Sequence, residues 1–247
     1  MPPKHLIRLD RWFARRLIKR EMPLGHKPGV ISFSFDDAFR TACNLGSRIL
    51  EAHDCRGTYY VAGGLTGKQK EGMDCHTRED LEALLAKGHQ VGCHTFFHTI
   101  CNRLPAARLA AELDRNAAFL AGLGLLPDRL HFAFPQGAYG LLVKRQCATR
   151  FQSARITGGG IHTGRADLNA LKSESLYDTT VSPERLHVLA RQTAAQRGWL
   201  IFYSHDVQAN PSPWGCSPKT LEIAVRSALN VGCRVLTVAE TIAYWEN

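Results

Sequence analysis

Two adjacent carboxylates follow an apolar run near the start of the chain, in the stretch VISFSFDDAFR from residue 30 to residue 40. Like charges side by side repel each other. A divalent cation that binds one carboxylate removes this penalty and leaves the other beside a water on the cation. Asp36 and Asp37 therefore indicate a catalytic metal site, with the capping of a following helix as the alternative for this pair taken alone.

Two histidines supply the other ligands that such a site needs. His94 and His98, in CHTFFHT, have the i, i+4 spacing that puts two imidazoles on one face of a helix, although 11 histidines in the chain make coincidence common. With Asp37 they form a set of two histidines and one carboxylate, which leaves positions open for water and substrate. Zn²⁺ is our first choice for this set, which also accommodates iron, cobalt, nickel or manganese.

Strand-like and helix-like segments alternate after residue 28. We predict strands at residues 30–35, 57–63, 89–94, 131–134, 151–156, 199–205 and 234–240. We predict helices at 41–53, 77–87 (with Thr77 as N-cap), 105–123, 141–149, 182–197 and 217–230. About seven such units favour an α/β fold, a distorted or incomplete (β/α) barrel, over a doubly wound open sheet.

Reactive groups in either architecture belong at the carboxyl ends of the strands. The aspartate pair follows the first predicted strand, and His94 and His98 follow the third. Pro135 and Gln136 follow the fourth, and His205 ends the sixth, where a lone histidine is more often a half-buried imidazole. Convergence of all these groups at one mouth favours a joint site over independent coincidences.

The first 28 residues form a distinct basic segment. Eight basic residues against two acidic ones place +6 of the net +9 there, and prolines and glycines from Pro23 to Gly29 separate it from the first strand. We expect an amphipathic helix with one apolar and one basic face: Leu6, Leu9, Phe13 and Leu17 against Lys4, Arg8, Arg11, Arg15 and Lys19. Either its apolar face packs on a barrel domain of residues 29–247, or the segment binds an anionic membrane surface or acidic partner.

Composition excludes several classes of protein. Hydrophobic residues make up 45% of the chain, so it is globular, and its eight scattered cysteines contain no CxxC pair and indicate reduced thiols. We find no apolar stretch typical of a signal peptide or a membrane span. We therefore expect a cytoplasmic protein, at most peripheral to the inner face of the membrane. No basic and aromatic pattern recurs beyond residue 28, so nucleic acid is not an expected partner.

Three motifs resemble those of the polysaccharide deacetylases, a family with a NodB-homology domain of the carbohydrate esterase family 4 type. The family includes nodulation N-deacetylases, chitin deacetylases and peptidoglycan N-acetylglucosamine deacetylases. SFDDA resembles the usual TFDDG, with Ala38 replacing glycine at an expected helix start; HTFFH matches H[ST]xxH; and YSHD resembles the last motif. The resemblance runs from about Val30 to Glu240, with the motifs in the right order.

The resemblance implies a metal-dependent hydrolase that converts an N-acetyl group on a GlcNAc-containing saccharide to an amine and acetate. It implies that Asp36 is the general base, that Asp37, His94 and His98 bind the metal, and that His205 is the general acid. A backbone N–H of the third motif would hold the oxyanion; Gln136 aligns best with this donor, and Pro135 beside it would line the substrate site. We expect Tyr139 and Trp214 either to stack on a sugar ring or to close a loop over the barrel.

The third motif departs from the family pattern. This chain reads HFAFPQGAYG, so the arginine that usually orients the base is missing and another group must orient Asp36. This departure leaves open a second function, hydrolysis of cyclic amides such as allantoin or imides on the same fold. A third alternative is a non-enzymatic protein that binds carbohydrate or an anionic surface, against which the intact set of aspartates and histidines argues.

Overall fold

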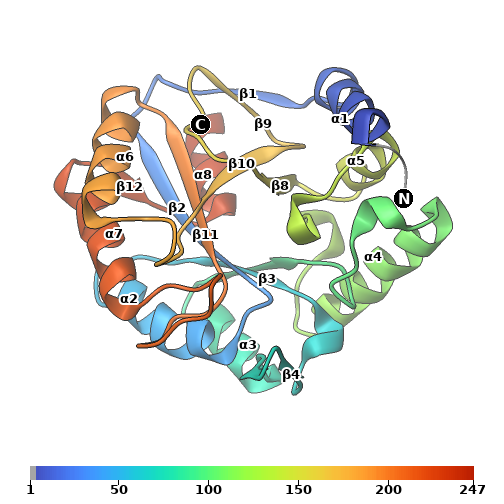
Figure 1. The fold of residues 1–247 in the computed structure, drawn as a ribbon, viewed down its shortest axis with the longest axis horizontal. Coiled ribbons are helices and arrows are strands. Elements are labelled where there is room, and N and C mark those ends of the chain that lie inside the picture. Colours follow the sequence, from blue (N-terminus) through green and yellow to red (C-terminus); the bar gives the residue numbers. More distant parts are fainter. Residues whose placement is uncertain (1–3) are drawn as a thin grey trace.

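Seven parallel strands form a closed barrel with all their carboxyl ends at one mouth (Figure 1). The computed structural model describes residues 4–247, with side chains from residue 9 onward. β2 pairs with β3 on one side and with β11 on the other, which closes the ring and excludes the open sheet. The order around the barrel is β2 (Val30–Asp36), β3 (Thr58–Val61), β6 (Gln90–Cys93), β7 (His131–Ala133), β8 (Ser153–Thr157), β10 (Leu171–Ser175) and β11 (Trp199–Ser204).

The alternation of side chains along β2 explains how the barrel is filled. Phe33 and Phe35 lie in the apolar layer outside the barrel, where Phe33 stacks on Phe202 with ring centroids 5.7 Å apart. The residues between them are small: the Ser34 hydroxyl donates to the Phe202 carbonyl (2.8 Å), and Ser32 accepts from the Trp199 indole (3.0 Å). Because successive side chains alternate, Asp36 falls on the same side as these serines.

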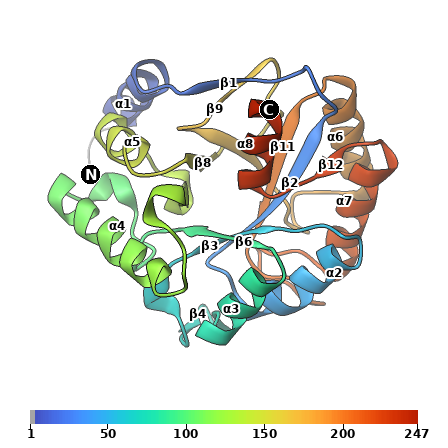
Figure 2. The ribbon, with the colours of Figure 1, turned by 180° about the vertical axis from the view of Figure 1, so that it is seen from behind.

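Helices surround the strands (Figures 1 and 2). They are α2 (Ser47–Glu51), which extends a π-helical turn at Ala42–Gly46, α3 (Arg78–Ala86), α4 (Ala106–Ala121), α5 (Leu141–Ala148), α6 (Pro183–Ala195) and α7 (Pro218–Asn230). Short 3₁₀ turns lie at Gly63–Leu65, Cys101–Arg103, Pro127–Arg129 and Pro135–Gly137. Thr77 caps α3 as predicted, because its side chain accepts from the Asp80 N–H while Asp80 bonds back to the Thr77 N–H. All eight cysteines are free and buried.

The predicted strand at residues 234–240 is mostly wrong. Only β12 (Arg234–Val235) is extended, and it pairs with the first two residues of β2. Thr237 then begins α8 (Val238–Glu246) through a reciprocal capping box with Glu240, which fixes a helix start inside the predicted strand. The strand that completes the barrel is β10, whose sequence LKSES alternates polar and apolar residues too briefly to stand out.

Smaller elements lie around the barrel. β1 (Glu21–Pro23) pairs antiparallel with β9 (Arg165–Asp167), and Met22 packs with Trp199 of β11 and Trp245 of α8. The two-residue strands β4 (Gln69–Lys70) and β5 (Met73–Asp74) form a hairpin. The first helix, α1 (Lys4–Leu17), lies beside α5. None of the helices within residues 4–247 combines the length and the apolar character that crossing a bilayer requires.

Two buried histidines, His131 in β7 and His162 in the loop that follows β8, predict a loss of stability in acid. Burial lowers the pKa of His131 and of His162 from the ordinary 6.5 to about 4. Below pH 6.5 the unfolded chain therefore binds protons that the folded chain does not, and stability falls as the pH drops from about 6.5 to about 4. Each group contributes up to about 1.4 kcal/mol per pH unit in this range.

The variant His131→Gln should therefore show a shallower dependence of the unfolding free energy on pH than the unsubstituted protein. Urea denaturation curves, recorded about every half pH unit between pH 7 and pH 4.5, measure this slope. Equal slopes for the two proteins would contradict the assignment of His131 as a buried neutral imidazole.

Candidate active site and metal centre

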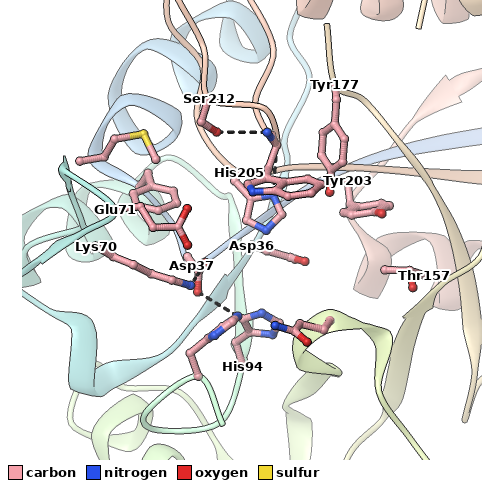
Figure 3. A pocket seen from close by; sticks show the side chains of 15 residues that line it. Asp36, Asp37, Lys70, Glu71, His94, Thr157, Tyr177, Tyr203, His205 and Ser212 are labelled. Atoms are coloured by element: carbon pink, nitrogen blue, oxygen red, sulfur yellow. Dashed lines mark hydrogen bonds and ion pairs between the residues drawn. The ribbon is translucent and has the colours of Figure 1, made fainter. Parts of the chain in front are cut away.

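A cavity of about 470 Å³ opens at the carboxyl ends of the strands (Figure 3). It contains every residue that the sequence predicts as catalytic or metal-binding, although these residues come from loops far apart in the chain. Its lining also includes Gln136 of the third motif and Trp214. The predicted residues that line it are Asp36, Asp37, His94, His98, Gln136, His205 and Trp214.

Three of these residues form a cluster that fits a divalent cation. One ligand atom from each of Asp37, His94 and His98 lies within 4.8 Å of the other two. Asp37 Oδ1 is buried and has no hydrogen-bond partner among the described residues, because His98 Nε2 is 3.5 Å away. His94 Nδ1–H donates to the Ala133 carbonyl (2.8 Å), which leaves the lone pair on Nε2 for a ligand. An orphaned carboxylate oxygen facing imidazole nitrogens is the donor set that a metal satisfies.

The protonation states suit the same purpose. Burial lowers the pKa of His94 to about 4 and also lowers the pKa of His98, so both imidazoles are neutral at pH 7. Burial would raise the pKa of Asp37, but His98, His94 and Lys70 outweigh it and hold this pKa at about 2. The trio is therefore an anionic carboxylate with two neutral imidazoles, as metal binding requires.

The two histidines do not lie on a helix, which corrects the interpretation of their spacing. His94 follows the end of β6, and residues 94–99 form a loop in which Thr95 (φ 60°) and His98 (φ 54°) are left-handed. The Thr95 hydroxyl accepts from the Thr99 N–H (2.9 Å), which fixes the turn. The loop brings the two rings to a centroid separation of 5.0 Å.

A strained turn orients the second aspartate. Asp37 (φ 61°) and Ala38 (φ 50°) both have left-handed backbone conformations. The sequence had suggested that Ala38 begins a helix, and this expectation is wrong. The buried His76 holds this turn: its Nδ1–H donates to the carbonyls of Asp37 (3.1 Å) and Ala38 (3.2 Å). The hydroxyl of Thr66 donates to the other ring nitrogen of His76 (3.0 Å). The turn brings the Asp37 carboxylate to the two histidines, with its Oδ1 3.5 Å from His98 Nε2.

Asp36 is bound by an arginine that the sequence analysis did not identify. Arg155 of β8 is fully buried, and its Nη2 contacts both oxygens of the Asp36 carboxylate. Burial would raise the pKa of Asp36, but the Arg155 guanidinium, with His94 and His205, outweighs it and lowers that pKa. Arg155 also donates to the Ser173 hydroxyl (2.9 Å).

Arg155 supplies the contact that the third motif lacks. In the parallel pairing of β7 with β8, Arg155 is the direct partner of Ala133, the residue in the segment where the family often carries its arginine. Paired residues in neighbouring strands project to the same side of the sheet. The guanidinium therefore reaches Asp36 from the adjacent strand, past the small side chain of Ala133.

His205 lies at the other side of the cavity on a loop that Asp206 holds. The buried Asp206 carboxylate accepts from both the backbone N–H (2.9 Å) and the hydroxyl (2.5 Å) of Ser212. This loop brings the Trp214 carbonyl to 3.1 Å from His205 Nδ1. A carbonyl only accepts, so Nδ1 carries the proton and Nε2 is the nitrogen left for the substrate.

Two predicted substrate contacts are not brought into the cavity. Tyr139 is buried outside it, with its hydroxyl accepting from Arg15 Nε (2.9 Å). Pro135 is also buried, and its neighbour Gln136, left-handed at φ 56°, is exposed and lines the cavity. Tyr139, which we expected near a sugar, therefore contacts α1 instead.

Other lining residues escaped the sequence analysis. Lys70, in the β4–β5 hairpin, places its ammonium 2.6 Å from Asp37 Oδ2, on the oxygen that the histidines do not face. Tyr177 and Tyr203 flank His205, with ring centroids 5.9 Å and 6.4 Å from the imidazole. Nothing in the sequence marked Lys70 or Tyr177, but a lone charge in an apolar strand was a signal for Arg155.

Known protein families and curated proteins include relatives of this chain. A family model described as polysaccharide deacetylase matches residues 25–151, more than half of the chain. The chain belongs to the polysaccharide deacetylase family. A chitin deacetylase from Colletotrichum lindemuthianum is 30% identical over 106 residues, an alignment that covers 40% of this chain and only 42% of that protein.

Solved structures share the fold of this polysaccharide deacetylase family member at low sequence identity. The structure of the Colletotrichum lindemuthianum chitin deacetylase has a TM-score of 0.60 at 17% identity, covering 89% of each chain. A family 4 acetyl xylan esterase from Clostridium thermocellum, in complex with a cobalt ion, has a TM-score of 0.60 at 15% identity, covering 87% of this chain and 91% of that one. A CE4 family pseudoenzyme from Bacillus anthracis has a TM-score of 0.59 at 11% identity, covering 87% and 66%. Because a pseudoenzyme shares the fold, activity has to be argued from the site.

Removing one ligand from the cluster should weaken metal binding. We expect His98→Ala to lower the affinity for Zn²⁺ by about a hundredfold or more, because two ligands remain of three. Isothermal titration calorimetry of the metal-free protein measures this. His187→Ala, which removes an exposed imidazole from α6, is the matched control and should bind Zn²⁺ like the unsubstituted protein. Equal affinity for the two variants would rule out His98 as a ligand.

Breaking the Asp36–Arg155 pair should destabilise the barrel. We expect Arg155→Met to lower the free energy of unfolding by about 3–5 kcal/mol, because Asp36 is left as an uncompensated buried charge. The double variant Arg155→Met with Asp36→Asn removes both charges and should recover much of the loss. Urea denaturation measures both, and a double variant no more stable than Arg155→Met would contradict charge as the cause.

Proposed function

We propose that this protein is a metal-dependent N-deacetylase that removes acetyl groups from a GlcNAc-containing saccharide. The observation that carries the proposal is that an ionised carboxylate, Asp36, and an imidazole, His205, line the same cavity as the Asp37, His94 and His98 cluster. Family membership and the named activity of the Colletotrichum lindemuthianum relative support the same reaction. A cation bound by the cluster, with Zn²⁺ the first choice, would polarise the amide carbonyl and lower the pKa of the attacking water.

Asp36 acts as the general base in this proposal. Its carboxylate is held by Arg155 and accepts the proton of the water as the water attacks the acetyl carbon. Because Arg155 keeps Asp36 ionised, the base is ready at neutral pH. The fixed guanidinium also restricts the carboxylate to one orientation, so the proton transfer needs no rearrangement.

His205 acts as the general acid. An amide nitrogen leaves as an amine only when it receives a proton. The bond from Nδ1–H to the Trp214 carbonyl fixes the ring, so a protonated His205 delivers the proton from Nε2. The carbon–nitrogen bond then breaks to give acetate and the free amine of the sugar.

Other lining groups would hold the saccharide. The Gln136 backbone N–H is our candidate donor to the oxyanion, since the left-handed conformation places this exposed residue at the cavity wall. Tyr177, Tyr203 and Trp214 form an aromatic wall, with the rings of Tyr177 and Trp214 5.9 Å apart. Aromatic rings pack well on the apolar faces of sugars, and Trp214 is exposed enough to do so.

The alternatives lose support. Hydrolysis of cyclic amides was left open because the third motif lacks the arginine that orients the base. Arg155 contacts the Asp36 carboxylate in place of that arginine. A purely binding function does not account for a buried base, an oriented imidazole and an orphaned carboxylate oxygen in one cavity. N-acetylated saccharides are therefore the substrates to test first.

Replacing the carboxylate of the proposed base with a side-chain amide should abolish turnover but leave metal binding intact. We expect Asp36→Asn to bind Zn²⁺ like the unsubstituted protein, because the three ligands remain, and to lose about a hundredfold or more in kcat, because the amide cannot accept the proton. Acetate release and the mass loss of one acetyl unit from N-acetylchitooligosaccharides measure the reaction. Asp54→Asn, an exposed aspartate away from the cavity, is the control. Full activity in Asp36→Asn would refute the base assignment.

A further inference from the structure

Helix α1 turns its apolar side chains outward. Leu9, Trp12, Phe13 and Leu17 are 52%, 48%, 43% and 63% exposed, whereas Ala14, on the opposite side, is fully buried. This corrects the expectation that the apolar stripe packs on the barrel and the basic face meets solvent. Leu6, Lys4 and Arg8 of the predicted faces lie outside the residues whose side chains the structure describes.

Polar contacts hold the inner side of the helix. Arg15 donates to the Tyr139 hydroxyl (2.9 Å), and the Arg11 guanidinium lies over the Tyr139 ring, 5.6 Å from its centroid. The Asp10 carboxylate accepts from the Leu141 N–H (3.0 Å), and so caps the start of α5. Because these basic and acidic groups fix the orientation, the apolar face cannot turn inward without breaking all of these contacts.

The outward face also carries positive charge. Arg16 lies between the apolar residues and stacks on Trp12, with its guanidinium 3.8 Å from the ring centroid. Lys19 follows the end of the helix and is exposed. We propose that this face of α1 docks on an anionic lipid bilayer, with its leucines and aromatic rings in the headgroup region and Arg16 on lipid phosphates.

The chemistry of the face fits a bilayer surface. Helix α1 lies at the periphery of the molecule beside α5 (Figures 1 and 2), where an amphipathic helix can lie flat on a membrane. Tryptophan, phenylalanine and arginine together match the interface, where apolar and charged layers meet. Each basic residue near an anionic surface adds to the binding.

A second copy of the chain is a poorer occupant. The four apolar side chains expose on the order of 400 Å², which is about half of what each partner buries in a stable interface. The first 28 residues carry +6 of the net charge, so two such faces would repel each other.

Vesicle co-sedimentation of the full chain tests the docking. We expect binding to vesicles of phosphatidylcholine with phosphatidylglycerol and much weaker binding to phosphatidylcholine alone. Phe13→Ser and Leu17→Ser should each lower the partition coefficient by about tenfold or more, since each removes one inserted apolar side chain. Arg16→Glu should lower it by roughly thirtyfold on anionic vesicles.

Matched controls lie elsewhere on the surface. Leu126→Ser removes an equally exposed leucine beyond α4, and Arg226→Glu reverses an exposed charge on α7; both should partition like the unsubstituted protein. Equal partitioning of Phe13→Ser and Leu126→Ser would overturn the proposal. A dimer in gel filtration that Leu17→Ser converts to monomer, without vesicle binding, would overturn it in favour of self-association. Acetate release from soluble oligosaccharides should be the same for Phe13→Ser and the unsubstituted protein.

Discussion

The buried pair of Asp36 and Arg155 is the interaction around which the mouth of the barrel is arranged. Neither charge is tolerable in the barrel interior without the other, since an unpaired buried ion costs several kcal/mol. The rings of Tyr60 and Tyr203 lie 5.2 Å and 5.0 Å from the guanidinium carbon and surround it on two sides. The pair therefore fixes one carboxylate at the bottom of the cavity, and the other reactive groups are placed relative to it.

The second carboxylate is positioned by strain instead of by an ion pair within the barrel. Two successive left-handed residues cost about 1 kcal/mol or more each, and the bonds from His76 to their carbonyls offset part of this. Without the turn, Asp37 would point to the opposite side of the strand from Asp36. The two carboxylate oxygens of Asp37 therefore have different partners: Oδ2 pairs with Lys70, and Oδ1 faces the histidines. The adjacent carboxylates of Asp36 and Asp37 are thus each compensated by a different cation, Arg155 and Lys70.

The sequence predicted the fold and the grouping of the candidate site residues better than it predicted their local geometry. Side-chain types at strand ends sufficed to place Asp37, His94 and His98 together, because all parallel strands end at one mouth. The conformation of the loop that carries the histidines depends on two non-glycine residues in left-handed conformations, which no spacing rule detects. The orientation of α1 depends on contacts with Tyr139, far along the chain, so its amphipathic pattern alone left both orientations open.

The partnership of Ala133 and Arg155 across neighbouring strands bears on how such chains are recognised. The guanidinium needs to reach one point in space, and two sequence positions give access to that point. In this chain, the arginine at one position is paired with a small residue, Ala133, at the other. A guanidinium that holds the base can therefore move from one strand to the next without leaving the site, and its absence from the third motif is not a loss of the ion pair.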